Sequence, residues 1–94
     1  MQVRYTWDES KRLRNIAERG LDFMDADLVL ASDYRLDVLS PRGNEMRIAS
    51  FAYVFEVLHV LLVVHAPGTD HRIISFRVAH PDEREIYHDW LAND

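Results

Sequence analysis

The run VLHVLLVVHA at residues 57–66 is the longest uncharged apolar stretch of this 94-residue sequence. Its β-branched residues predict a strand over residues 57–64 that lies inside a sheet and is covered on both faces. A membrane-spanning helix needs about 20 apolar residues, roughly twice the length of this run. The expectation is therefore a buried central strand and no membrane segment.

Other strands are predicted on both sides of this run. Alternating apolar and polar residues predict a strand from residue 34, which the turn sequence SPRGN at 40–44 ends. Residues 45–66 contain two strands with their connection near Phe55-Glu56. The turn sequence PGTD at 67–70 then leads into a last strand over 72–78. We expect these four strands to form an antiparallel sheet.

Three helices are predicted outside the strands. Asp8 as N-cap and Gly20 as the stop define a helix over 9–19. A second helix is expected over about 23–31, and Pro81 begins a third over 81–91. The residues expected to be buried are Leu13, Ile16 and Ala17 in the first helix and Ile86, Trp90 and Leu91 in the last. The order ααββββα is typical of an α+β fold.

Length and composition indicate one small domain over residues 1–94. The chain has no cysteine, which excludes disulfides, thiolate metal sites and thiol nucleophiles and suits the cytoplasm. A net charge of -5 disfavours a protein that coats nucleic acid. The charge is uneven, because residues 1–19 carry five basic side chains against three acidic ones. A local basic patch therefore remains compatible with the composition.

Several kinds of chemistry find no support in the sequence. His59, His65 and His71 are six residues apart, which is no metal-ligand spacing on a strand or a helix. No serine lies in a G-x-S-x-G motif, and the three glycines are isolated, so there is no nucleophile elbow or phosphate-binding glycine loop. Acidic pairs lie at helix starts or on solvated faces. We therefore expect neither a metal nor an organic cofactor.

Arg47 and Arg77 are isolated cations in otherwise apolar predicted strands. Such a position costs stability unless the guanidinium reaches solvent, a carboxylate or a ligand phosphate. One alternative to a ligand is an ion pair, for example between Arg47 and Asp37. The first helix adds a polar, basic face that consists of Lys11, Asn15 and Arg19. This face is either a solvated flank of the helix or a ridge that contacts phosphate.

Two sets of motifs carry a family likeness over residues 5–87. The first is W-D-E-x-K followed by an asparagine and G-L-D-F, at residues 7–23. The second is R-I-I-S-F-R-x-A at 72–79, followed by Glu83-Arg84 and Tyr87. In this order and spacing, together with Arg47, they resemble the BrnT toxin family. The chain departs from the family pattern at Glu18 and Val78, where a basic residue is common.

The resemblance implies a RelE-like fold and a ribonuclease that arrests translation as the toxin of a type II toxin–antitoxin module. It also implies neutralisation by a BrnA antitoxin with a ribbon-helix-helix DNA-binding region. The two proteins would form a two-plus-two heterotetramer that represses its own promoter. RNA would be the substrate, and DNA would be contacted only through the antitoxin.

If the chain cleaves RNA, the ribose 2′-hydroxyl attacks its own phosphate, and the protein must orient the strand, stabilise the dianion and move a proton. In this hypothesis Arg47, Arg77 and Lys11 clamp the phosphate, and His65 or His80 carries the proton. The residues expected to contact RNA elsewhere are Arg12, Asn15, Arg19 and Arg72. The hypothesis requires Arg47 and Arg77 to meet on one open, concave face.

Two other functions stay open at this point. The chain is either a catalytically weak toxin-like module whose main role is to bind the antitoxin and co-repress the operon, or an acidic domain of a larger assembly. RNA degradation by the chain alone distinguishes a ribonuclease from a module that mainly binds the antitoxin.

Overall fold

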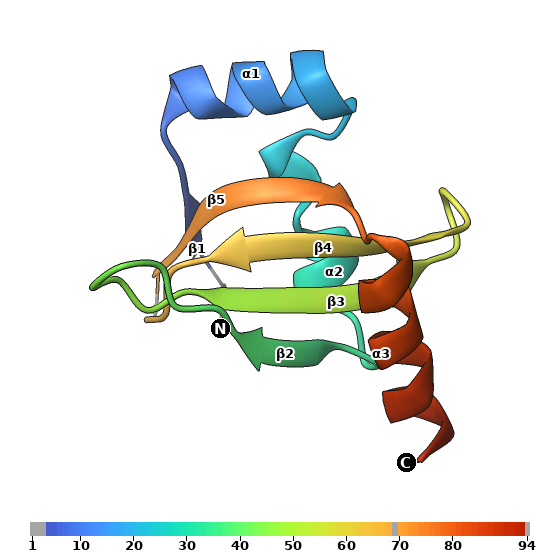
Figure 1. Ribbon diagram of the computed structural model, residues 1–94. Helices are drawn as coiled ribbons and strands as arrows, with labels where there is room; N and C mark the ends of the chain where they lie inside the picture. The colour runs from blue at the N-terminus through green and yellow to red at the C-terminus, as the bar shows by residue number, and fades with distance from the viewer. Residues whose placement is uncertain (1–3, 69, 94) are drawn as a thin grey trace.

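A computed structural model describes residues 4–68 and 70–93 as a mixed sheet with helices on both faces and along one edge (Figure 1). The strands are β1 (Arg4–Thr6), β2 (Leu36–Leu39), β3 (Ile48–Val54), β4 (His59–His65) and β5 (Asp70–Val78). The helical elements are α1 (Glu9–Arg19), the 3-10 turn η1 (Phe23–Asp25), α2 (Asp27–Leu30) and α3 (Pro81–Ala92). The strand order is β1-β5-β4-β3-β2. No helix in the described ranges is long and apolar enough to cross a membrane.

The apolar run forms the middle of the sheet, as predicted. β4 pairs antiparallel with β3 on one side and β5 on the other, and Val60, Leu61, Leu62 and Val63 are buried. The β3–β4 connection falls at residues 55–58, with Leu58 in the left-handed region at φ 58°. The predicted turn at 67–70 includes Thr69, which lies outside the described residues.

The prediction of a four-stranded antiparallel sheet was wrong. A fifth strand, β1, lies at the edge of the sheet and pairs parallel with β5, with Arg4 opposite Asp70. β1 has three residues, too few to establish a period-two pattern. Its partner follows more than sixty residues later in the chain, so no local turn signals the pairing.

Helix α1 has the predicted ends but not the predicted buried face. Asp8 accepts hydrogen bonds from the backbone of the first turn, and Gly20 ends the helix at φ 71°. Leu13 is nevertheless 55% exposed, and the one buried residue of the helix is Asn15. The reason is that α1 lies along the β5 edge and does not cover a face of the sheet (Figure 1).

Asn15 attaches α1 to that edge. Its Nδ2 donates to the carbonyls of Phe76 (2.8 Å) and Leu21 (2.8 Å), while Phe76 N donates to Asn15 Oδ1 (3.3 Å). In the part of the chain that the structure describes, β1 pairs with β5 over residues 70–72, and the backbone of Phe76 has no strand partner on this side. The side-chain amide takes the place of that partner.

Two hydrophobic clusters cover opposite faces of the sheet. The predicted helix over 23–31 is divided into η1 and α2, whose buried residues include Phe23 and Val29 and pack on one face. On the other face α3 packs through Tyr87 and Leu91. The predicted inward positions Ile86 and Trp90 are 54% and 36% exposed, because the rotation of α3 directs Tyr87 to the sheet.

Candidate functional site

Four arginines meet on the sheet face that α3 covers at one end. They line a pocket of about 270 Å³, which we call the arginine pocket. Its cationic residues are Arg19 at the end of α1, Arg42 and Arg47 in the β2–β3 connection, and Arg77 on β5. Ser75 and Val64 contribute to the floor. The two arginines singled out from the sequence thus reach one pocket from distant parts of the chain.

Arg47 and Arg77 are each paired with a carboxylate. Arg77 donates two hydrogen bonds to Glu83, at 2.7 and 2.9 Å, and both side chains are only about a fifth exposed. Arg47 Nε lies 3.2 Å from Glu45 Oε1, so the pair proposed from the sequence, Arg47 with Asp37, was wrong. The hydrogen bond from Arg77 lowers the pKa of Glu83, and the one from Arg47 lowers the pKa of Glu45. Both carboxylates therefore stay ionised at neutral pH and orient the guanidinium groups.

A second pocket of about 240 Å³ adjoins the first along α1, and we call it the α1 pocket. The basic residues that line it are Lys11, Arg14 and Arg19. Arg19, Ile74 and Ser75 line both pockets. Within residues 4–68 and 70–93, none of the three cations of the α1 pocket has a carboxylate within 4 Å. Arg14 was not predicted, although its spacing from Lys11 on the helix could have indicated it.

His80 lies beside the arginine pocket. It is the N-cap of α3, and its side chain is 64% exposed. His80 Nδ1 is 3.5 Å from Glu83 Oε1, the same oxygen that binds Arg77. The exposed imidazole and the Arg77 guanidinium therefore share the Glu83 carboxylate.

His65, the other histidine suggested as a proton carrier, lies on the opposite face of the sheet. Along β4 its side chain follows Leu61 and Val63 into the cluster under α2, whereas Val64 points to the arginine pocket. His65 is fully buried, and burial lowers its pKa. It cannot reach a phosphate bound between Arg47 and Arg77.

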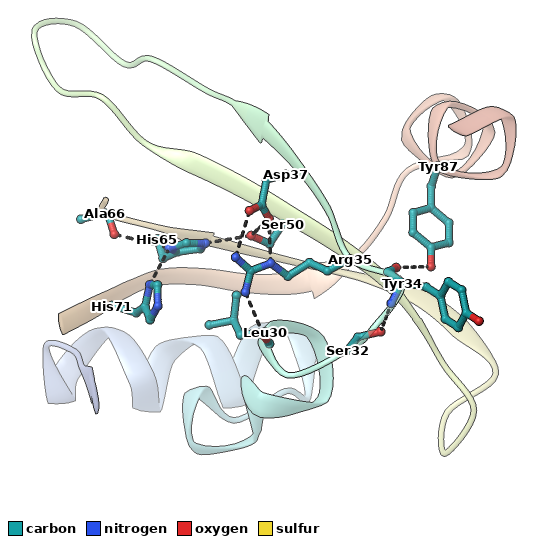
Figure 2. Close-up of polar contacts among 10 residues, drawn as sticks. All are labelled: Leu30, Ser32, Tyr34, Arg35, Asp37, Ser50, His65, Ala66, His71 and Tyr87. Carbon is teal, nitrogen blue, oxygen red and sulfur yellow. Dashed lines mark hydrogen bonds and ion pairs between the residues drawn. The ribbon is translucent and has the colours of Figure 1, made fainter. Parts of the chain in front are cut away.

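His65 belongs instead to a polar network that runs from the buried Ser50 to the exposed Asp37 and that was not predicted from the sequence (Figure 2). Ser50 Oγ donates to Asp37 Oδ1 (2.6 Å), and His65 Nε2 lies 2.8 Å from Ser50 Oγ. The hydroxyl has one proton, so His65 Nε2 must donate to it, and His65 Nδ1 is left to accept from His71 Nδ1 at 3.3 Å. Ser50 is fully buried, so this serine and histidine are no nucleophile and base.

Arg35 closes the network on the side of β2. It donates two hydrogen bonds of 2.9 Å to Asp37 and one of 2.8 Å to the Leu30 carbonyl at the end of α2. Burial raises the pKa of Asp37, but the bonds from Arg35 and Ser50 outweigh it, and the pKa of Asp37 lies below its ordinary value. The carboxylate thus joins β2, β3 and α2.

Three residues predicted to contact RNA have other partners. Arg12 binds Asp22 at 2.9 Å and Glu9 at 2.8 Å, which fixes α1 to the following loop. Both N–H donors of Asn15 are used within the fold. Arg72 pairs with Glu45 at the surface. Of the residues in that prediction, Asn15 and Arg19 line the α1 pocket, and Arg19 is the cation of the two.

The chain is thus a small α+β domain with an arginine-lined pocket on one face of its sheet. Within the described residues no group of three or more histidine, aspartate or glutamate side chains is placed to hold a metal ion.

A family model described as "Ribonuclease toxin, BrnT, of type II toxin-antitoxin system" matches residues 7–83. The chain therefore belongs to the BrnT family of type II toxin–antitoxin ribonuclease toxins, and this membership implies an antitoxin partner. No curated protein matches the sequence.

Proposed function

We propose that the protein is a metal-independent endoribonuclease that inhibits translation as the toxin of its module. The observation that carries this proposal is the meeting of four arginines from three separate segments in one open pocket. Guanidinium groups bind phosphate through two parallel hydrogen bonds, and a phosphodiester is the group that a ribonuclease must hold.

The proposed reaction is an internal transfer at phosphorus. The 2′-oxygen loses its proton and bonds to the adjacent phosphorus, while the bond to the 5′-oxygen breaks and that oxygen takes up a proton. The products are a 2′,3′-cyclic phosphate and a 5′-hydroxyl. Arg47 and Arg77 bind the nonbridging oxygens and stabilise the negative charge that develops on them. Lys11 and Arg19 hold the strand alongside.

His80 is the residue that moves a proton in this proposal. Imidazole is the side chain whose ordinary titration lies closest to neutral pH. The shared contact of His80 and Arg77 with Glu83 supports the assignment, because it keeps the imidazole near the bound phosphate.

The proposed partner is a BrnA-like antitoxin with a ribbon-helix-helix region, in a heterotetramer that contacts DNA through the antitoxin. Both proteins would act in the cytoplasm, where the RNA substrate is found. A second candidate function is that of a catalytically weak module that mainly binds the antitoxin. The pairing of Arg47 and Arg77 with carboxylates favours it, since these groups compete with phosphate for the same donors.

The experiment is to incubate the purified chain with a single-stranded RNA in the presence of EDTA. We expect fragments with 2′,3′-cyclic phosphate ends, and their formation should stop when the protein encoded next to the toxin gene is added. Induction of the chain alone should also arrest growth. Intact RNA together with normal growth, from a protein that is folded by circular dichroism, would favour the second candidate.

A further inference from the structure

The arginine pocket and the α1 pocket form one continuous surface. Arg19, Ile74 and Ser75 line both of them, so a ligand can pass from one pocket to the other without leaving the protein. We propose that the α1 pocket is a second phosphate site, and that the substrate is a single RNA strand that occupies both pockets. The inference rests on the proposed function and names the substrate class of that site.

The cations of the two pockets differ in whether a carboxylate pairs with them. In the arginine pocket Arg47 and Arg77 are compensated by Glu45 and Glu83. In the α1 pocket no such pair holds the three cations within the described residues, and Glu18 is its one acidic lining residue. Uncompensated cations attract a polyanion at a distance, and they gain more from a phosphate because no carboxylate must be displaced.

The two pockets therefore have different tasks. The compensated arginines are held in a fixed orientation at the reacting phosphate, while Lys11 and Arg14 retain the strand. Like Lys11, Arg14 lines only the α1 pocket, so a substitution of Arg14 separates strand binding from the reaction.

The shape of this surface favours a single strand over a duplex. Proteins that bind single strands use a positively charged groove that follows the backbone. Double-stranded RNA is recognised across successive grooves over about 16 base pairs. Two adjoining pockets of about 240 and 270 Å³ offer a path for a few nucleotides and no such extended footprint.

The test compares a dinucleotide, which has one phosphodiester, with an octanucleotide of the same base composition. The wild-type chain should prefer the octanucleotide in kcat/KM. Arg14→Gln should reduce this preference about tenfold, the loss of roughly one charge-assisted contact to phosphate. Arg84→Gln is the matched control, because Arg84 is an exposed arginine on α3 that lines neither pocket. It should leave the preference unchanged.

Binding gives a second readout that does not depend on cleavage. The affinity for a 2′-deoxy octanucleotide, which cannot be cleaved by the proposed reaction, should fall with salt. In Arg14→Gln the slope of log affinity against log salt should decrease by about 0.7. Glu18→Gln should tighten binding, since it removes the carboxylate from the α1 pocket.

The outcomes are distinguishable. An equal effect of Arg14→Gln and Arg84→Gln, or equal loss on both substrates, overturns the two-pocket inference while cleavage itself stands. Binding of the deoxy octanucleotide with the expected Arg14 dependence, but no cleavage of RNA, supports the second phosphate site and refutes the nuclease. Absence of both binding and cleavage in the wild-type chain refutes the proposed function together with the inference.

Discussion

The two faces of the sheet differ in whether their polar side chains find hydrogen-bond partners within the protein. Under α2, Asp37, Ser50 and His65 are joined to one another and to Arg35, and the two buried side chains, Ser50 and His65, both have protein partners. On the other face, the arginine pocket and the α1 pocket gather more cations than the nearby carboxylates neutralise. A polar group that is satisfied internally stabilises a fold, whereas an excess of donors on an open surface is available to a ligand.

The largest effect that tests this comparison is on catalysis. Arg77→Ala should lower the RNA cleavage rate by about 10²- to 10³-fold, because it removes a donor to the charge that develops in the transition state. Arg77→Ala also leaves the largely buried Glu83 without its partner and should lower the free energy of unfolding, so the rate is measured on a chain shown to be folded by circular dichroism. Arg77→Lys keeps the charge but loses the planar fork, and should recover only part of the rate. Full activity in a folded Arg77→Ala chain would remove this arginine from the site.

Two serines on opposite faces of the sheet, Ser50 on β3 and Ser75 on β5, provide the next test. Ser50→Ala should lower the free energy of unfolding by about 1–3 kcal/mol, because it leaves the buried His65 Nε2 without its partner. Ser75→Ala, on the open face, should cost less than about 0.5 kcal/mol. Urea denaturation measures both. Equal costs would mean that the two faces do not differ as described.

The smallest effect is a dependence of stability on pH. Burial lowers the pKa of folded His65 below its ordinary value. As the pH falls below about 6.5, the unfolded chain takes up a proton that the folded chain does not, so the free energy of unfolding decreases. The decrease is at most about 1.4 kcal/mol per pH unit and is fully reversed above pH 6.5.

This pH effect can be assigned by substitution. His65→Gln keeps an N–H group near Ser50 but does not titrate, so it should flatten the dependence between about pH 6.5 and 5. His59→Gln, at an exposed position at the start of β4, should leave the dependence as it is. Asp37, whose pKa is lowered, changes the free energy of unfolding only at more acidic pH. His71 on β5 is the titratable side chain in contact with His65. A dependence that persists in His65→Gln would assign the effect to His71 or to another group.

Local signals in the sequence predicted the elements well. Asp8 and Gly20 define α1, Pro81 begins α3, and the strand predicted over 57–64 overlaps the central strand β4 at 59–65. Each of these features depends on interactions within a few residues, such as a cap, a fixed φ or a side-chain alternation. The motifs also led to the family, because they are themselves short patterns in the chain.

Long-range packing was not predictable in the same way. β1 is defined by a parallel pairing with β5, and α1 lies at an edge where the buried residue is Asn15 and the apolar Leu13 is exposed. Nothing within either segment specifies these partners. The same holds for the site, because Arg47 and Arg77 have the same chemistry as Arg12 and Arg72 and differ from them only in their neighbours.

Residue types and local periodicity sufficed to predict an α+β domain and most of its strands, and the resemblance of its motifs predicted the family. Only the tertiary structure decided which side chains are buried and which line a pocket. His65 faces the α2 side and is enclosed, whereas Arg14 and Arg42, which no motif highlighted, line the open pockets. The physical reason is that exposure and ion pairing are properties of a side chain and its spatial neighbours, and those neighbours are brought together only when distant segments pack.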